Sequence, residues 1–102
     1  MTKSGQPLND FRLTARLVHK DTIRYTPAGQ TVLECQLEYS GKVVEAGIER
    51  KVDLKLLAVA IGQEVNILDQ MQIGGVGNFQ GFIAHQSIQR QALVFHITHI
   101  SI

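Results

Sequence analysis

The sequence contains few of the residues that mark special classes of protein. Its 102 residues include one cysteine, two prolines and no tryptophan, and aromatic side chains make up only 6% of them. A single cysteine excludes an internal disulfide and fits a reducing compartment. A run of about 20 apolar residues, the length of a membrane-spanning helix, is also missing. Residues 1–8 are polar and lack the apolar stretch of a signal peptide, so we expect a cytoplasmic protein with a flexible N-terminus over residues 1–8.

The chain also lacks an excess of either positive or negative charge. Ten Lys and Arg stand against nine Asp and Glu, and the net charge of +1 argues against a strongly basic tail that wraps nucleic acid. It does not exclude a local basic patch. Hydrophobic residues make up 44% of the chain, enough for a packed core. Because chains of this length usually form one domain, we expect residues 1–102 to be a single domain.

Alternation of apolar and polar residues predicts five strands, since a half-buried strand has a period of two. They span residues 9–19, 32–39, 48–60, 76–85 and 93–100. Between the third and fourth, the spacing of Ile61, Val65, Leu68 and Met71 predicts a short amphipathic helix. Residues 24–31, with Pro27 and Gly29, are expected to form a turn, and residues 40–47 a flexible polar loop.

This order of elements predicts an all-β fold of the OB type. Five antiparallel strands of this size close into a small barrel that hides their edges, and the helix between strands 3 and 4 plugs one open end. Gly77 and Gly81 lie within the fourth strand, where glycine favours a bend or a bulge. An open sandwich would need more strands than the chain offers.

Two candidate sites of catalysis or metal binding involve Cys35 and the histidines. Cys35 shares the predicted inward face with Leu33 and Leu37, where a thiol is packed and poorly ionised. His96 and His99 are three apart on a strand, so they point to opposite faces and cannot converge on one ion. The sequence therefore predicts no nucleophile and no metal site.

Two further enzyme signals are also weak. The glycines at 75, 77 and 81 echo a dinucleotide fingerprint, but their spacing is wrong and a strand follows where a helix is required. The carboxylates of Glu34, Glu38 and Asp53 lie on predicted solvent faces, without the apolar pocket that raises a pKa. We expect a protein that is not an enzyme and has neither a cofactor nor a small-molecule substrate.

The distribution of cations suggests a nucleic-acid surface. In an OB barrel, strands 2 and 3 and the loops 1–2 and 4–5 form the groove for oligonucleotides. The residues expected to bind single-stranded DNA there are Arg24, Tyr25, Lys42, Arg50, Lys51, Lys55, His85 and Arg90. Alternating Glu49, Lys51, Asp53 and Lys55 are equally typical of an ordinary solvated face, and Glu34 and Glu38 would repel phosphate.

Four stretches together resemble one family. They are the turn at residues 25–29, the strand at 32–38, the loop at 45–50 and the segment 79–83, in an order that spans nearly the whole chain from Asn9. The set is similar to the PriB family, the primosomal replication protein N of bacteria. The resemblance implies a small cytoplasmic OB-fold homodimer that binds single-stranded DNA, contacts and stimulates the PriA helicase and helps to bring in other primosome proteins.

The chain departs from that family at the DNA-binding positions. Arg24 and Arg50 keep basic residues, but Ile48 stands at the loop aromatic and Asp53 at the strand tryptophan of enterobacterial members. Residues 85–90 replace a lysine-rich loop. Since stacking contributes about 1–3 kcal/mol per base, we expect weaker DNA binding than in those members.

The predicted first strand gives an independent reason to expect a dimer. The first strand is long and contains no proline, and as an exposed edge it would invite pairing with its own copy about a two-fold axis. The predicted dimer interface consists of Phe11, Leu13, Ala15 and Leu17.

Three other functions are weighed against this one. A coating protein of the single-stranded DNA-binding type is disfavoured, because no Gly-rich linker or acidic tip follows the last predicted strand. An OB-fold protein–protein adaptor with weak or lost DNA binding is the main alternative, since fold alone does not establish function. A small hydrolase lacks a plausible nucleophile–base pair.

Overall fold

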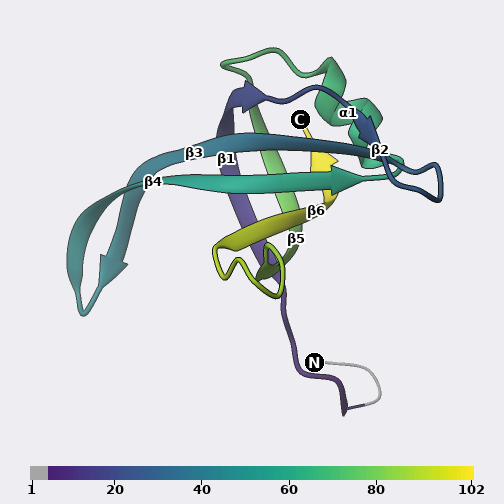
Figure 1. Ribbon diagram of the computed structural model, residues 1–102. Coiled ribbons are helices and arrows are strands. Elements are labelled where there is room, and N and C mark those ends of the chain that lie inside the picture. Colours follow the sequence, from purple (N-terminus) through teal and green to yellow (C-terminus); the bar gives the residue numbers. More distant parts are fainter. Residues whose placement is uncertain (1–4) are drawn as a thin grey trace.

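The computed structural model describes residues 5–102, and the first four residues of the predicted flexible N-terminus lie outside the described residues. Residues 5–8 are exposed. The elements are β1 Phe11–Lys20, β2 Arg24–Tyr25, β3 Thr31–Glu45, β4 Ile48–Ile61, α1 Glu64–Gln70, β5 Val76–His85 and β6 Leu93–Ser101 (Figure 1). Within residues 5–102, no helix is long and apolar enough to cross a membrane.

The long strands close into a barrel, which confirms the predicted OB fold. β1 pairs with β5 over its first part and with β3 over its last part. β6 then joins β5 to β4, and β4 pairs with β3 along its whole length. Each long strand therefore has two neighbours within the chain, which is how a barrel removes its edges.

Two details of the predicted topology are wrong. The strands are not all antiparallel, because β4 and β6 run parallel from the pair Ala58 and Phe95 to the pair Ala60 and Ile97. The helix lies between β4 and β5 rather than between strands 3 and 4. The two-residue strand β2, which lies inside the predicted turn, raises the number of every later strand by one. Alternation of apolar and polar residues cannot reveal so short a strand.

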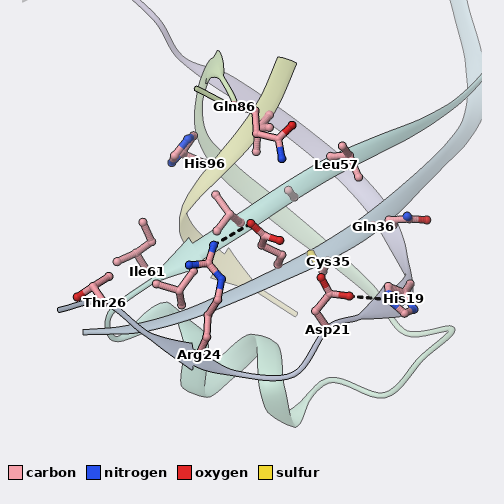
Figure 2. Close-up of a pocket in the computed structure, with 15 residues that line it drawn as sticks. His19, Asp21, Arg24, Thr26, Cys35, Gln36, Leu57, Ile61, Gln86 and His96 are labelled. Atoms are coloured by element: carbon pink, nitrogen blue, oxygen red, sulfur yellow. Dashed lines mark hydrogen bonds and ion pairs between the residues drawn. The ribbon is translucent and has the colours of Figure 1, made fainter. Parts of the chain in front are cut away.

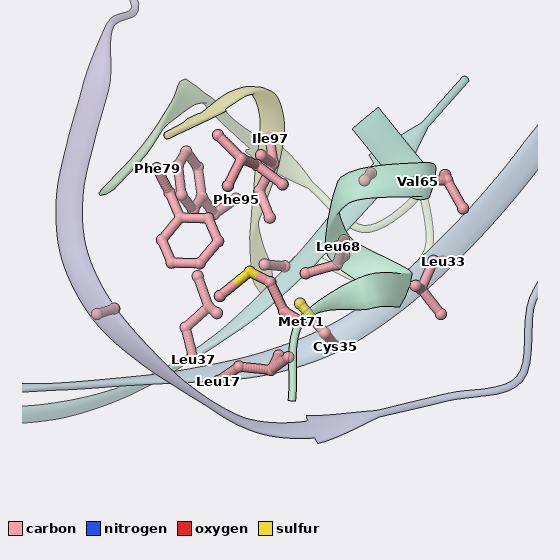
Figure 3. Packing of buried hydrophobic residues seen from close by; sticks show 14 residues of the cluster. Leu17, Leu33, Cys35, Leu37, Val65, Leu68, Met71, Phe79, Phe95 and Ile97 are labelled. Atoms are coloured by element: carbon pink, nitrogen blue, oxygen red, sulfur yellow. The ribbon is translucent and has the colours of Figure 1, made fainter. Parts of the chain in front are cut away.

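The core fills the barrel and continues under the helix (Figure 3). Phe79, Phe95 and Leu37 are among the fully buried side chains. α1 turns Val65 and Leu68 toward them, which confirms that an amphipathic helix covers one end of the barrel.

Gly81 lies at a bulge in the β5–β6 pairing, as its position in the strand predicted. A Cβ at this residue would overlap the backbone carbonyl of His96, which cannot move without breaking the ladder. A residue without a side chain is therefore required where β5 and β6 approach each other this closely.

The segment 40–47 is not the flexible loop that was predicted from its sequence. The β3–β4 ladder continues without interruption from the pair Val32 and Ile61 to the pair Glu45 and Ile48. Ala46 and Gly47, with φ of 54° and 77°, form the two-residue turn, which has the positive φ values that tight hairpins need. Residues 40–53 thus form a hairpin arm that extends beyond the barrel (Figure 1).

Candidate nucleic-acid interface

A hollow of about 300 Å³ lies on the outer face of β3 and β4. Side chains alternate along a strand, so the same alternation that builds the core turns Glu34 and Gln36 of β3, with Leu57 of β4, outward into it. The short strand β2 supplies Arg24, and the loop of residues 86–92 supplies Gln86. Figure 2 shows Arg24 on one side of β4 and Gln86 with His96 on the other. This is the place where an OB barrel binds oligonucleotides.

The floor of this hollow is apolar although it lies outside the barrel. Val32, Val59 and Val94 form a buried cluster separate from the main core. Beside them, Leu57 and Ile61 remain more than two-fifths exposed. An apolar floor of this kind suits the faces of unpaired bases better than it suits phosphate.

Two charge pairs stand at the edge of the hollow. Arg24 donates through Nη2 to Oε2 of Glu34 at 2.9 Å, and His19 Nε2 lies 2.8 Å from Oδ1 of Asp21. The side chains of Arg24 and Glu34 are 59% and 43% exposed. Exposed pairs contribute only about 0–1 kcal/mol, so a phosphate can compete with Glu34 for the guanidinium.

The cations of the hairpin arm are each paired with a carboxylate. Lys42 lies 3.7 Å from Glu49, Lys51 lies 3.9 Å from Asp53, and Arg50 pairs with Glu45. Its three cations and three carboxylates leave the arm without net charge. This is the pattern of a solvated face, which the sequence analysis kept as the alternative.

The structure places the predicted DNA-binding residues in separate groups. Arg24 and the exposed Tyr25 lie at one end of the β3–β4 ladder, and the arm cations lie at the other end. Lys55 stands between them, opposite Glu38. His85 and Arg90 belong to the ends of the loop that follows β5, and both are exposed. Only Arg24 lines the hollow itself.

Two cations of β1 have structural roles. Arg16 donates to the carbonyl of Gly74 at 2.7 Å. Lys20 Nζ donates to the carbonyls of Asp69 and Met71, both at 2.7 Å, where α1 ends and its last carbonyls need partners. These contacts fix the connection between α1 and β5 against β1.

The side chains of the predicted dimer interface face the barrel. Leu17 and Ala15 are buried, and Phe11 and Leu13 pack partly buried against the core. β1 is not an exposed edge along its length, which corrects the premise of that prediction. Among the described residues, two stretches of β1 have no partner strand on one side: residues 11–15 on the side that faces away from β5, and residues 18–20 on the side that faces away from β3.

One pair of aromatic residues on the outer face is absent from the predicted site residues. Phe82 stands outside on β5 and stacks on His96 of β6, with ring centroids 4.8 Å apart and planes 6° apart. The outward position of Phe82 could have been predicted from the sequence, because Phe79 and Phe82 are three apart on one strand and so face opposite sides.

Cys35 behaves as a packed residue. It is 3% exposed, and burial, with a smaller effect of the Asp21 carboxylate, raises the pKa of its thiol from 9.0 to about 12. A thiol in this state is a poor nucleophile. Among residues 5–102, no group of three or more His, Cys, Asp or Glu side chains is arranged to hold a metal ion.

Comparison with known proteins places this geometry in context. Residues 9–99 match a family model described as another single-strand binding protein family. The replication restart protein PriB of Bordetella pertussis is 39% identical over 77 residues, which cover 76% of this chain and 72% of that protein. The structure of PriB from Ralstonia solanacearum superposes with a TM-score of 0.87 at 37% identity and covers 93% of this chain and 97% of that one.

A more distant structure shows the fold alone. The single-stranded DNA binding protein from Thermus aquaticus has a TM-score of 0.71 at 22% identity, covering 92% of this chain and 49% of that one.

Proposed function

The chain belongs to the PriB family of replication restart proteins, and from this membership we propose that it binds single-stranded DNA as a non-catalytic accessory factor of replication restart. The observation that carries the proposal is the hollow on the outer face of β3 and β4. It combines an apolar floor with a guanidinium at its edge, and it lies between the two loops that an OB barrel uses for oligonucleotides.

The geometry suggests how a strand would bind. Unpaired bases would rest on the exposed side chains of Leu57 and Ile61, while a phosphate takes Arg24 from Glu34. Lys55 and Arg90 have no ion-pair partner among the described residues, so they are the cations most ready to contact further phosphates. A groove of this type follows the backbone by charge and holds the bases by stacking.

The binding we infer is weaker than in enterobacterial family members. Each arm cation already has a carboxylate neighbour, and Asp53 stands beside Lys51 where those members carry a stacking tryptophan. Fewer phosphate contacts also mean a shallower dependence on salt, by about 0.7 in the logarithmic slope per contact on a single strand.

Family membership also supports a proposal about the partners. We infer that the protein acts in the cytoplasm as a homodimer with the PriA helicase and other primosome proteins. For the dimer, the open side of residues 11–15 supports pairing of two β1 strands about a two-fold axis, through backbone groups rather than through the inward side chains.

Fluorescence anisotropy of a labelled oligothymidylate tests the proposed site. Arg24→Ala and Arg90→Ala should each weaken binding and flatten the salt slope by about 0.7. Arg12→Ala is the matched control, because this arginine is 71% exposed and lies on β1, outside the hollow. Equal losses in all three variants would assign binding to diffuse charge and overturn the proposed site.

One observation favours a second function. The neutral arm exposes the apolar side chains of Val43, Val44 and Ile48, as a protein-binding surface would. If the folded protein fails to bind the oligonucleotide at low salt, the adaptor function replaces DNA binding.

A further inference from the structure

The stacked pair of Phe82 and His96 has no role in holding the main core together. The two residues face each other directly across the β5–β6 ladder, and both side chains stand on the outer face of the barrel. Phe82 is 38% exposed. Apart from this pair, the outer face holds few aromatic rings, because Phe79 and Phe95 are buried inside.

The pair continues a row of side chains across the sheet. Val59 of β4 pairs with His96, and Glu34 of β3 pairs with Val59. The row therefore runs from the Arg24–Glu34 ion pair, over Val59 and His96, to Phe82. Adjacent residues in such a row stand on the same face and in contact distance.

Two hollows meet along this row. His96, Val59 and Ile61 line the hollow that contains Arg24, and they also line a second hollow of about 500 Å³ that contains Phe82. The two hollows thus form one continuous surface from the guanidinium of Arg24 to the phenyl ring of Phe82.

The chemistry of the second hollow suits an uncharged planar ligand. Its polar rim consists of the amides of Gln30 and Gln63 and the hydroxyl of Thr98, groups that can donate and accept hydrogen bonds as base edges do. Its carboxylate, Glu64, accepts the backbone N–H of Ile100 at 2.9 Å. Among residues 5–102, no Lys or Arg lines this hollow. A phosphate would find no cation there, whereas a base would find aromatic and apolar faces.

We propose that Val59, His96 and Phe82 form a base-stacking subsite for unpaired nucleobases, reached from the phosphate contact at Arg24. The inference rests on the proposed function and deepens it. It directs the DNA strand across β4, β6 and β5 rather than out along the neutral hairpin arm. Base stacking is tolerant of sequence, because every base has a planar face.

The absence of tryptophan from the chain makes a direct test available. Phe82→Trp places one indole at the subsite, and its fluorescence should be quenched when oligothymidylate is added. An oligonucleotide of the same length built from abasic residues carries the same charge but no bases, and it should cause little quenching. Ile73→Trp is the control, since Ile73 is 57% exposed on the α1–β5 connection and lines neither hollow.

Affinity measurements separate this inference from the function on which it rests. Phe82→Leu should weaken binding of oligothymidylate by about five-fold to about 150-fold, the range for loss of one stacked base, and Phe82→Tyr should restore it. Binding of the abasic oligonucleotide should not change. If wild type binds but Phe82→Leu binds equally well, or if base-bearing and abasic strands quench Phe82→Trp alike, the subsite is refuted while the function stands. If wild type does not bind at low salt, the function itself fails.

Discussion

Arg24 and Glu34 bind each other at 2.9 Å across the mouth of the hollow in which a DNA strand is proposed to lie. One residue comes from the short strand β2 and the other from β3, so the sheet holds the pair in place. The cation proposed to bind phosphate is therefore already paired with a carboxylate on the same proposed DNA-binding face.

Glu34→Gln should tighten binding of single-stranded DNA by about two-fold to about five-fold. The amide keeps the shape of the side chain but no longer competes with phosphate, and an exposed pair is worth at most about 1 kcal/mol. Asp10→Asn is the matched control, because it adds the same charge beside Arg12, outside the hollow. A similar gain in both variants would mean that only the net charge matters.

Gly81→Ala should lower the free energy of unfolding by about 1–3 kcal/mol or more, the usual cost of overpacking. The added Cβ would overlap the His96 carbonyl, which is held in the ladder. Gly77→Ala should cost less, since its Cβ would lie 3.3 Å from Met71 Cε and 3.3 Å from Phe79 Cζ, which are side-chain atoms at a tight contact rather than a backbone carbonyl at overlap. Thermal denaturation followed by circular dichroism gives both values, and an equal or larger loss at Gly77 would contradict this ranking.

Cys35 should make stability depend on alkaline pH. The pKa of the thiol is raised in the folded state, so the neutral thiol is favoured there, and its contribution is complete below pH 9.0. The contribution should be lost as pH rises from 9.0 toward about 12, because the unfolded chain then releases the proton first. Urea denaturation of wild type and Cys35→Ala should show a constant difference below that window and a shrinking one within it. A difference that stays constant to the end of the window would contradict the burial of the thiol.

Proline substitutions can test the edge of β1 without destroying the barrel. Leu17 donates its N–H to Gly75 and accepts from Gly74 through its carbonyl, so Leu17→Pro would unfold the chain. Backbone groups alternate in direction along a strand, which turns the N–H of Thr14 to the open side. Thr14→Pro should therefore shift the protein toward monomer in sedimentation, while Thr14→Val, which keeps the N–H, should remain dimeric. A dimer in both variants would place the interface elsewhere.

Alternation was sufficient to predict most of the fold. The inward set that includes Leu17, Leu37 and Phe95 gave the strands and their faces, and the spacing of Val65 and Leu68 gave the helix. The hairpin arm was not predictable in this way, because its residues leave the barrel and lose the alternation that burial imposes. The parallel pairing of β4 with β6 joins distant segments and has no local signal.

The candidate site was predictable only in part. Fold type locates the groove, and Arg24 is found there. Charge alone could not show that Lys42 and Arg50 each have a carboxylate neighbour, since those two pairs depend on the β3–β4 register. Lys51 and Asp53 are two apart on β4, so their proximity could be predicted from the sequence. The outer position of Phe82 was legible from its spacing to Phe79, but the stack with His96 required the β5–β6 register.

The most direct test of the central claim compares two DNA probes. Wild-type protein is titrated into a labelled oligonucleotide, single-stranded in one sample and annealed to its complement in the other, at low and at physiological salt. The account predicts binding to the single strand that weakens with salt and clear preference over the duplex, whose bases cannot reach the apolar floor. Equal affinity for the two probes, or no binding to either by the folded protein at low salt, would contradict it.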